Sequence, residues 1–281
     1  KLSLLSRTTD ILITSSSGNI KRIPTSSFKV QKKNGKGIKS QDDITDTIIR
    51  TNTIDQLMIF TNKGNMYRLL VNDIPAGINA SKGQPITSLV EMASGEKPTV
   101  IYSIYRDTDA QYVIFATKNG LVKKTALSEY TSTKKKSGIP AIKLREDDEL
   151  VAVSLVKDEN IILVSSAGNA IRFKSSEVSA AGRLTIGLKG MTLKPEEEVI
   201  SMSVVRDSKD NLATFSSIGM AKQFSLTELP LQARGGKGIK IGDVAAVALI
   251  SNEDNLLVCG AKNSICISAK DIPILSRSIF A

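Results

Sequence analysis

The 281-residue sequence contains no histidine, no tryptophan and only two cysteines. Without histidine, the chain cannot form the usual Ser-His-Asp or Cys-His catalytic arrangements, and it lacks the commonest zinc ligand. Cys259 and Cys266 are too few for a disulfide framework. On a single strand their separation would span roughly 23 Å, far beyond disulfide reach. We therefore interpret both as small apolar residues of a late strand and expect a reducing, cytoplasmic location.

Long apolar runs are also absent, so the sequence predicts no transmembrane helix. The N-terminus has neither the apolar stretch of a signal peptide nor a starting methionine, and we expect a piece of a longer protein. Aromatic residues make up only 4% of the chain, which disfavours blades of the WD or kelch type. No G-x-x-x-x-G-K-[ST] motif is present, so a nucleotide P-loop is not supported.

A repeated pattern does run through the chain: an apolar strand, a turn at glycine, and a second strand carrying cations. The turns lie at Gly18, Gly64, Gly120, Gly168 and Gly219, with a degenerate sixth copy at Asn263-Ser264. Glycine beside residues that tolerate positive φ is typical of β-hairpin turns. No segment sustains a helical apolar stripe over three turns. The pattern therefore predicts a series of hairpins.

The spacing of about 45–55 residues per copy is typical of an all-β, propeller-like ring. We expect one six-bladed domain over residues 1–281, with blades at about 8–52, 53–108, 109–156, 157–207, 208–250 and 251–281. The sixth copy is short. Its final strands are either missing or supplied by the N-terminal Leu2–Leu5 segment.

Positive charge gathers in six glycine-containing segments that follow the hairpins, which we call the first to sixth connectors. Their residues are 29–41, 74–90, 130–145, 178–195, 229–242 and 272–281. The connectors hold 18 of the 38 basic residues and no Asp or Glu, whereas the whole chain has a formal net charge of +10. A surface that follows a phosphate backbone excludes carboxylates for electrostatic reasons. On net charge alone, a basic protein with no polyanion partner would fit equally well.

Glycine in the connectors allows close backbone approach to phosphate and exposes N–H donors as anion-binding nests. A single Gly-Lys-Gly is more often an ordinary basic turn, so it is the recurrence of glycine and cations across the connectors that indicates phosphate binding. Further cations recur four residues after the hairpin glycines. These are Arg22, Arg68, Lys124 and Arg172, which either extend the binding path or lie along the sheet surface.

Two connectors contain related motifs, Gln31-Lys32-Lys33-Asn34-Gly35-Lys36-Gly37 and Gln232-Ala233-Arg234-Gly235-Gly236-Lys237-Gly238. Both resemble the Gln-Arg-Arg-Gly-Gly-Lys-Gly box of the C-terminal domains of DNA gyrase A subunits. The first motif departs by lysine at 32 and 33 and asparagine at 34. Segments such as Asn119-Gly120-Leu121-Val122-Lys123-Lys124-Thr125 and Gly187-Leu188-Lys189-Gly190-Met191 are also gyrase-like. The resemblance covers about residues 10–281.

The resemblance implies a β-pinwheel whose blades exchange strands, with duplex DNA bent around the rim to enable negative supercoiling by the holoenzyme. It implies, as partners, double-stranded DNA, the gyrase B subunit and the N-terminal cleavage domain of the same polypeptide. It implies no catalysis by this domain alone, and we expect no cofactor, metal or membrane partner. The same fold occurs in topoisomerase IV, where the first box of the corresponding domain is degraded, so Asn34 keeps that alternative open. A propeller that serves as a protein-interaction platform and a propeller enzyme are the more distant alternatives.

The predicted DNA-binding residues fall in five connectors. They are Gln31, Lys32, Lys33, Gly35, Lys36, Gly37, Lys39, Lys82, Lys134, Lys135, Lys136, Lys143, Arg183, Lys189, Arg234, Gly235, Gly236, Lys237, Gly238 and Lys240. The cluster from Lys134 to Arg145 is alternatively a solvated run of charge. Since smooth bending of 20–30 bp by 40–90° costs on the order of 1–6 kcal/mol, we expect counterion release to offset it and binding to weaken steeply with salt.

Overall fold

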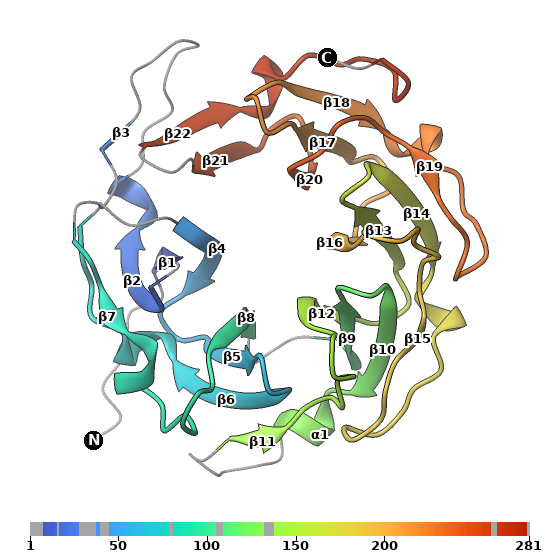
Figure 1. The fold of residues 1–281 in the computed structure, drawn as a ribbon. Coiled ribbons are helices and arrows are strands. Elements are labelled where there is room, and N and C mark those ends of the chain that lie inside the picture. The colour runs from blue at the N-terminus through green and yellow to red at the C-terminus, as the bar shows by residue number, and fades with distance from the viewer. Residues whose placement is uncertain are drawn as a thin grey trace. The chain divides into compact units, whose positions relative to one another are not determined.

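A computed structural model describes residues 8–15, 17–27, 38–39, 45–78, 81–104, 109–131, 138–259 and 263–279 (Figure 1). Its residue contacts divide the chain into two compact units. The first unit contains residues 1–108, 134–140 and 255–268. The second contains residues 109–133, 141–254 and 269–281. None of the helices in the described segments is long and apolar enough to cross a membrane.

Each repeat begins with an antiparallel hairpin. The first hairpin strands are β1 (Thr9–Ser15), β5 (Gln56–Thr61), β9 (Tyr112–Thr117), β13 (Asn160–Ser165), β17 (Asn211–Phe215) and β21 (Asn255–Cys259). The second are β2 (Asn19–Pro24), β6 (Asn65–Leu70), β10 (Leu121–Ala126), β14 (Asn169–Lys174), β18 (Ala221–Ser225) and β22 (Asn263–Ser268). A third strand pairs with the other edge of the first: β4 (Thr45–Asn52), β8 (Pro98–Ile104), β12 (Leu150–Val156), β16 (Val199–Val205) and β20 (Ala246–Ile250).

The remaining elements are short. Two-residue strands are β3 (Ile38–Lys39), β7 (Gln84–Pro85), β11 (Ile139–Pro140), β15 (Leu188–Lys189) and β19 (Ile239–Lys240). One-turn helices are η1 (Thr25–Ser27), η2 (Val71–Asp73), η3 (Ile86–Ser88), α1 (Ser128–Thr131), η4 (Ser175–Glu177), η5 (Leu226–Glu228) and η6 (Ala269–Asp271). This agrees with the weak helical signal in the sequence.

Neighbouring repeats exchange strands. A two-residue strand from the connector of the following repeat pairs with the second hairpin strand of the preceding one, as β7 pairs with β2 and β15 with β10. The first unit contains the sheets β4-β1-β2-β7, β11-β6-β5-β8 and β21-β22-β3. The second contains β12-β9-β10-β15, β16-β13-β14-β19 and β18-β17-β20. Each four-stranded sheet among the described residues therefore takes one strand from another repeat.

First hairpin strands such as β9 and β13 are buried on both faces, which explains their continuous apolar sequence, whereas Leu256 to Val258 of β21 are half-buried. In β9 all residues after Tyr112 are buried, and in β13 Ile161 to Ser165 are buried. Side chains of adjacent repeats share these cores, since Ile114 clusters with Ile161 and Phe173. Burying both faces of a small sheet requires stacking on neighbours, as expected for repeat architectures.

The described residues thus confirm the predictions of an all-β chain and of hairpins at the five glycine turns. In the sixth sheet β3, from the first connector, takes the exchanged position beside β22, where Lys39 and Ile38 pair with Asn263 and Ser264. Among the described residues no strand pairs with the other edge of β21, and Leu2–Leu5 lies outside the described residues, so the two expectations for the final strands stay predictions. The two cysteines lie on two paired strands rather than one, and Cys266 is a free thiol.

Candidate nucleic-acid interface

The second, fourth and fifth connectors follow one path along the second hairpin strand of the preceding repeat. Each first forms a single parallel bridge to that strand, as Ala180 does with Lys124 and Leu231 with Arg172. It then turns and returns as a two-residue antiparallel strand, β7, β15 or β19. In the fourth and fifth connectors the turn between these contacts contains Arg183, or Arg234 and Lys237. The exposed cations of the described connectors include Lys82, Lys143, Arg145, Lys189, Lys237 and Lys240.

A glycine is required where such a turn approaches the preceding strand. Gly238 has φ +72°, and a Cβ placed on it would lie 2.5 Å from the carbonyl oxygen of Ala170. Gly83 has φ +79° and makes the same approach to the carbonyl of Ile20. No other residue fits this backbone without displacement. Gly83, and Gly238 of the Gly-Lys-Gly motif, therefore determine how closely the turn is held to the sheet, in addition to any role in phosphate binding.

Three glutamates lie against the connectors, although the connector sequences contain none. The backbone N–H groups of Arg183, Arg234 and Arg277 donate to the carboxylates of Glu129, Glu177 and Glu228, at 3.3, 2.8 and 2.8 Å respectively. Each glutamate belongs to α1, η4 or η5, next to the point where a connector begins. The absence of acids thus holds along the sequence but not in space. The missed signal was an acidic residue immediately before the connector, which recurs at Asp73, Glu129, Glu177, Glu228 and Asp271.

Arg234 crosslinks two connectors. Its Nε donates to the carbonyl of Glu177 at 3.1 Å, and its Nη1 donates to the carbonyl of Lys189. The N–H of Gly235 also donates to the carbonyl of Gly190 at 2.8 Å. The fourth and fifth connectors are therefore hydrogen-bonded to each other. This arrangement holds Lys237 on a defined turn.

Three of the four strand cations form contacts between repeats, whereas Arg68 donates to Gln56 of its own hairpin. Arg22 donates through Nε to the carbonyl of Ile74 at 2.9 Å, and Lys124 donates through Nζ to the carbonyl of Ser175 at 2.8 Å. Arg172 donates to the carbonyl of Leu226 in the same way, at 3.1 Å. Burial lowers the pKa of Lys124 and of Arg172. These side chains hydrogen-bond to the helical turn of the following repeat or to the residue after it. We therefore interpret them as structural contacts between repeats and not as an extension of the binding path.

The predicted site residues divide into two groups. Those in the first connector up to Gly37, together with Lys134, Lys135 and Lys136, lie outside the described residues, and Lys39 is described only by its backbone pairing in β3. The others are described. Lys82, Lys143, Lys189, Lys237 and Lys240 are exposed, whereas Arg183 and Arg234 are half-buried. In the second unit the described members include two consecutive connectors that are hydrogen-bonded to each other.

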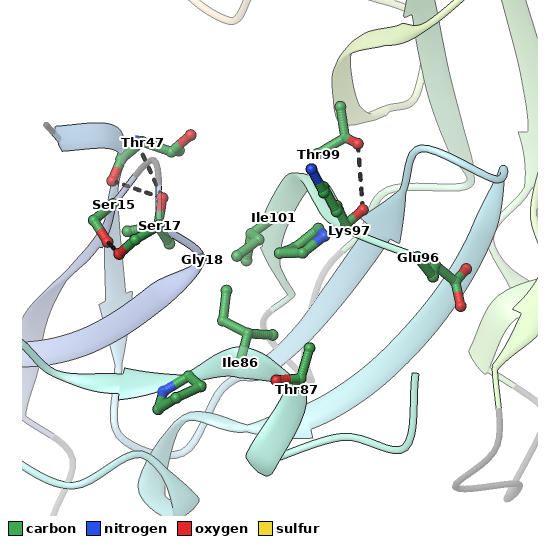
Figure 2. A pocket seen from close by; sticks show the side chains of 13 residues that line it. Ser15, Ser17, Gly18, Thr47, Ile86, Thr87, Glu96, Lys97, Thr99 and Ile101 are labelled. Atoms are coloured by element: carbon green, nitrogen blue, oxygen red, sulfur yellow. Dashed lines mark hydrogen bonds between the residues drawn. The ribbon is translucent and has the colours of Figure 1, made fainter. Parts of the chain in front are cut away.

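A cavity of about 540 Å³ lies in the first unit, between the hairpin turn at Gly18 and the start of β8. Figure 2 shows Ile86 and Ile101 between the hydroxyls of Ser15 and Thr47 on one side and Lys97 on the other. Glu96 is the one acidic residue among the described residues that line it. Its carboxylate accepts hydrogen bonds from the hydroxyls of Thr61 and Tyr67. A glycosidase needs two convergent carboxylates, which the described lining residues do not provide.

The described residues also contain no group of three or more His, Cys, Asp or Glu side chains placed to hold a metal ion. Within each unit the candidate site thus consists of glycine-rich connectors that carry cations and pair with the second hairpin strand of the preceding repeat. Such an arrangement suits electrostatic contact with a polyanion.

Comparison with known proteins gives the same family as the sequence motifs. The family described as "DNA gyrase C-terminal domain, beta-propeller" matches residues 9–47, 55–92, 111–157, 159–206 and 210–245. The DNA gyrase A protein of Lawsonia intracellularis (strain PHE/MN1-00) is 34% identical over 271 residues, which cover 91% of this chain and 33% of that protein. The DNA gyrase A protein of Staphylococcus aureus (strain NCTC 8325 / PS 47) is 33% identical over 264 residues, covering 88% and 30%. The chain spans about a third of the length of these relatives.

Two solved structures are similar over nearly the whole chain. A DNA gyrase A C-terminal domain has a TM-score of 0.85 at 24% identity, covering 96% of this chain and 92% of the other. A C-terminal domain of DNA topoisomerase IV has a TM-score of 0.72 at 25% identity, covering 98% and 88%. The predicted fold class is confirmed; the family model matches five segments, and six small sheets are described. The chain belongs to the family of DNA gyrase C-terminal domains, with a β-propeller fold.

Proposed function

We propose that this chain binds duplex DNA without sequence preference along its connectors and bends it, so that a gyrase-type holoenzyme can introduce negative supercoils. The observation that carries the proposal is the recurrence of exposed cations in connectors whose sequences contain no acidic residue. Lysine on a glycine-rich turn supplies a point charge rather than a bidentate fork, which suits phosphate contact more than base readout.

Membership of the gyrase C-terminal family supports the wider proposal. The relatives are named as gyrase A proteins, which implies a larger assembly in which this chain joins a cleavage domain and the gyrase B subunit. In that assembly the chain performs no bond cleavage itself, and it acts in the cytoplasm on chromosomal DNA. The predicted contacts are the twenty residues named from the sequence, including those of the first box.

The test is a titration of a duplex of about 150 bp, one persistence length, with energy transfer between its ends to report bending. A salt series gives the number of phosphates neutralised, since each contributes a slope of about −0.9. The triple variant Lys32/Lys33/Lys36→Ala tests the first box. Steeply salt-dependent bending that the variant loses supports the proposal, and no binding at low salt overturns it.

A topoisomerase IV-type role is the second candidate. The similarity to a topoisomerase IV C-terminal domain over 98% of this chain favours it, together with Asn34 in the first box. That role predicts that bending survives the triple variant, because the remaining connectors then dominate the contact.

A further inference from the structure

Three lysines of the second hairpin strands are almost fully buried. Lys21, Lys123 and Lys222 are 2%, 2% and 3% exposed. A buried ammonium has three donors and no acceptor, and it is tolerated only when hydrogen-bonded. Lys123 and Lys222 also lie 5.0 and 5.8 Å from the ring centres of Phe115 and Phe224, where cation–π attraction contributes.

Each of these ammonium groups has a partner in the connector of the following repeat, and Lys123 has a second partner, Ala141, in the connector of its own repeat. The Nζ of Lys21 donates to the carbonyl of Ser81 at 3.0 Å. The Nζ of Lys123 donates to the carbonyl of Arg183 at 2.9 Å, and to that of Ala141 at 2.7 Å. The contacts of Lys222 are of the same kind: its Nζ donates to the carbonyls of Arg277 at 2.8 Å, Ser276 at 3.5 Å and Ile279. The second, fourth and sixth connectors therefore each accept hydrogen bonds from a buried lysine of the preceding repeat.

The other repeats place an apolar or aromatic side chain at the same register position. Strand pairing aligns Lys21, Lys123 and Lys222 with Tyr67, Ile171 and Ile265. A Cβ built on Gly138 of the third connector would lie 2.5 Å from the ring of Tyr67. One built on Gly236 of the fifth would lie 3.2 Å from Cδ1 of Ile171. At these glycines the two connectors thus contact side-chain carbon, although the third connector also accepts a hydrogen bond from Lys123 through the carbonyl of Ala141.

The connectors differ in how many cations their sequences contain. The first and third hold five each, the fourth and fifth hold three each, and the second and sixth hold one each. Lys82 is the one cation of the second connector, which Lys21 contacts, so the placement of that connector matters most for its contribution to DNA contact.

We propose that Lys21, Lys123 and Lys222 are positioning residues for DNA contact, which hold the second, fourth and sixth connectors in the shape that presents their cations and backbone to the duplex. The inference rests on the proposed function. Without the ammonium, the carbonyls of the turn lose their donors and the turn rearranges, because unpaired buried polar groups are costly. The exposed charge of the connector stays the same while its geometry is lost.

The test uses the full chain with Lys123→Ile. Isoleucine occupies this register position in two other repeats, so the side chain suits the strand. Lys157→Ile removes an exposed lysine of the same unit, outside the connectors, and is the control. Affinity for duplex DNA is measured across a salt series, and hydrogen exchange is followed at the connector amides of Ala181 and Gly190.

We expect Lys123→Ile to weaken DNA binding on the order of fivefold and to speed exchange at both amides, with an unchanged salt slope. The control should change neither affinity nor exchange by a comparable amount. Wild-type affinity and exchange in Lys123→Ile would refute the proposal. A salt slope smaller by about 0.9 would also refute it, because the lysine would then contact phosphate itself.

If Lys123→Ile fails to fold, Lys222→Ile makes the same test on the sixth connector and Lys21→Ile on the second. Failure of the wild-type chain to bind DNA would refute the proposed function, and this inference with it. DNA binding by the wild type that all three variants retain unchanged would refute the inference alone.

Discussion

The Nη1 of Arg22 lies 3.0 Å from the Oδ2 of Asp10, and the side chains are only 13% and 3% exposed. The same guanidinium donates through Nε to the carbonyl of Ile74 in the following repeat. One buried ion pair thus joins the first strand of one repeat to the helical turn of the next. Buried ion pairs add little net stability, but removing one partner leaves an uncompensated charge.

We therefore expect Arg22→Met to lower the free energy of unfolding by about 3–5 kcal/mol, because Asp10 stays buried without its partner. Arg206→Met is the control. Arg206 pairs with Glu159 at 2.8 Å but its side chain is 52% exposed, so its loss should cost less than about 1 kcal/mol. Urea unfolding of both variants measures the difference. Equal losses would contradict a structural role for the Arg22–Asp10 pair.

The stability of the second unit should depend on Lys123 in alkaline solution. Burial lowers the pKa of Lys123 from 10.5 to about 8, with Glu129 opposing and Arg183 adding to the decrease. Between these values the unfolded chain binds more protons than the folded one, so stability rises with pH over that interval and is lost as pH falls toward 8. The gain is at most about 3 kcal/mol. Urea unfolding from pH 7.5 to 10.5 should show it in the wild type relative to Lys123→Ile, and parallel curves would contradict it.

A methyl group at Gly238 should disturb the fifth connector. Gly238→Ala places a Cβ 2.5 Å from the carbonyl of Ala170 at φ +72°, so we expect a loss of about 3 kcal/mol and weaker DNA binding. Gly219→Ala is the matched control, because Gly219 has φ +85° but open space around it. Backbone strain alone should then cost about 1 kcal/mol. A loss of equal size in the two variants, measured by urea unfolding, would show that the close approach to β14 contributes nothing.

Glu96 should stabilise the second hairpin at neutral pH and fail to do so in acid. Burial acts to raise the pKa of Glu96, but hydrogen bonds from Thr61, Tyr67 and Asn65 and from the amide of Ala93 outweigh it and hold the pKa below 4.5. Its contribution is therefore complete above about pH 4.5 and lost as pH falls through the folded-state pKa. Glu96→Ala should cost about 3 kcal/mol at pH 7 and much less near pH 3.

Glu91 is the control for this prediction, since it is exposed on the same repeat. Thermal unfolding of Glu91→Ala should match the wild type at both pH values. A cost of Glu96→Ala that is the same at pH 3 and pH 7 would contradict the assigned protonation.

The hairpins could be predicted from sequence because Gly64 or Gly120 between apolar runs has a local physical cause. The strand exchange could not be derived from spacing, since β15 and β19 have two residues each and carry no periodicity. It followed only from the family resemblance. The contacts of Arg234 with Glu177 also lie beyond sequence reasoning, because they join segments 57 residues apart. Buried lysines such as Lys123 look like surface cations in a sequence, and only the structure distinguishes them.

The strand exchange has a consequence for the order in which the protein can assemble during synthesis. A hairpin such as β9–β10 leaves the ribosome before β15 has been made, so the edge of β10 stays unpaired until the next repeat follows. Of the exchanged strands described, β3 stays unpaired longest, because it lies in the first connector but pairs with β22 of the sixth repeat. Unpaired strand edges are templates for association with other chains. A nascent chain of this kind therefore remains vulnerable to misassembly until its last repeat has been translated.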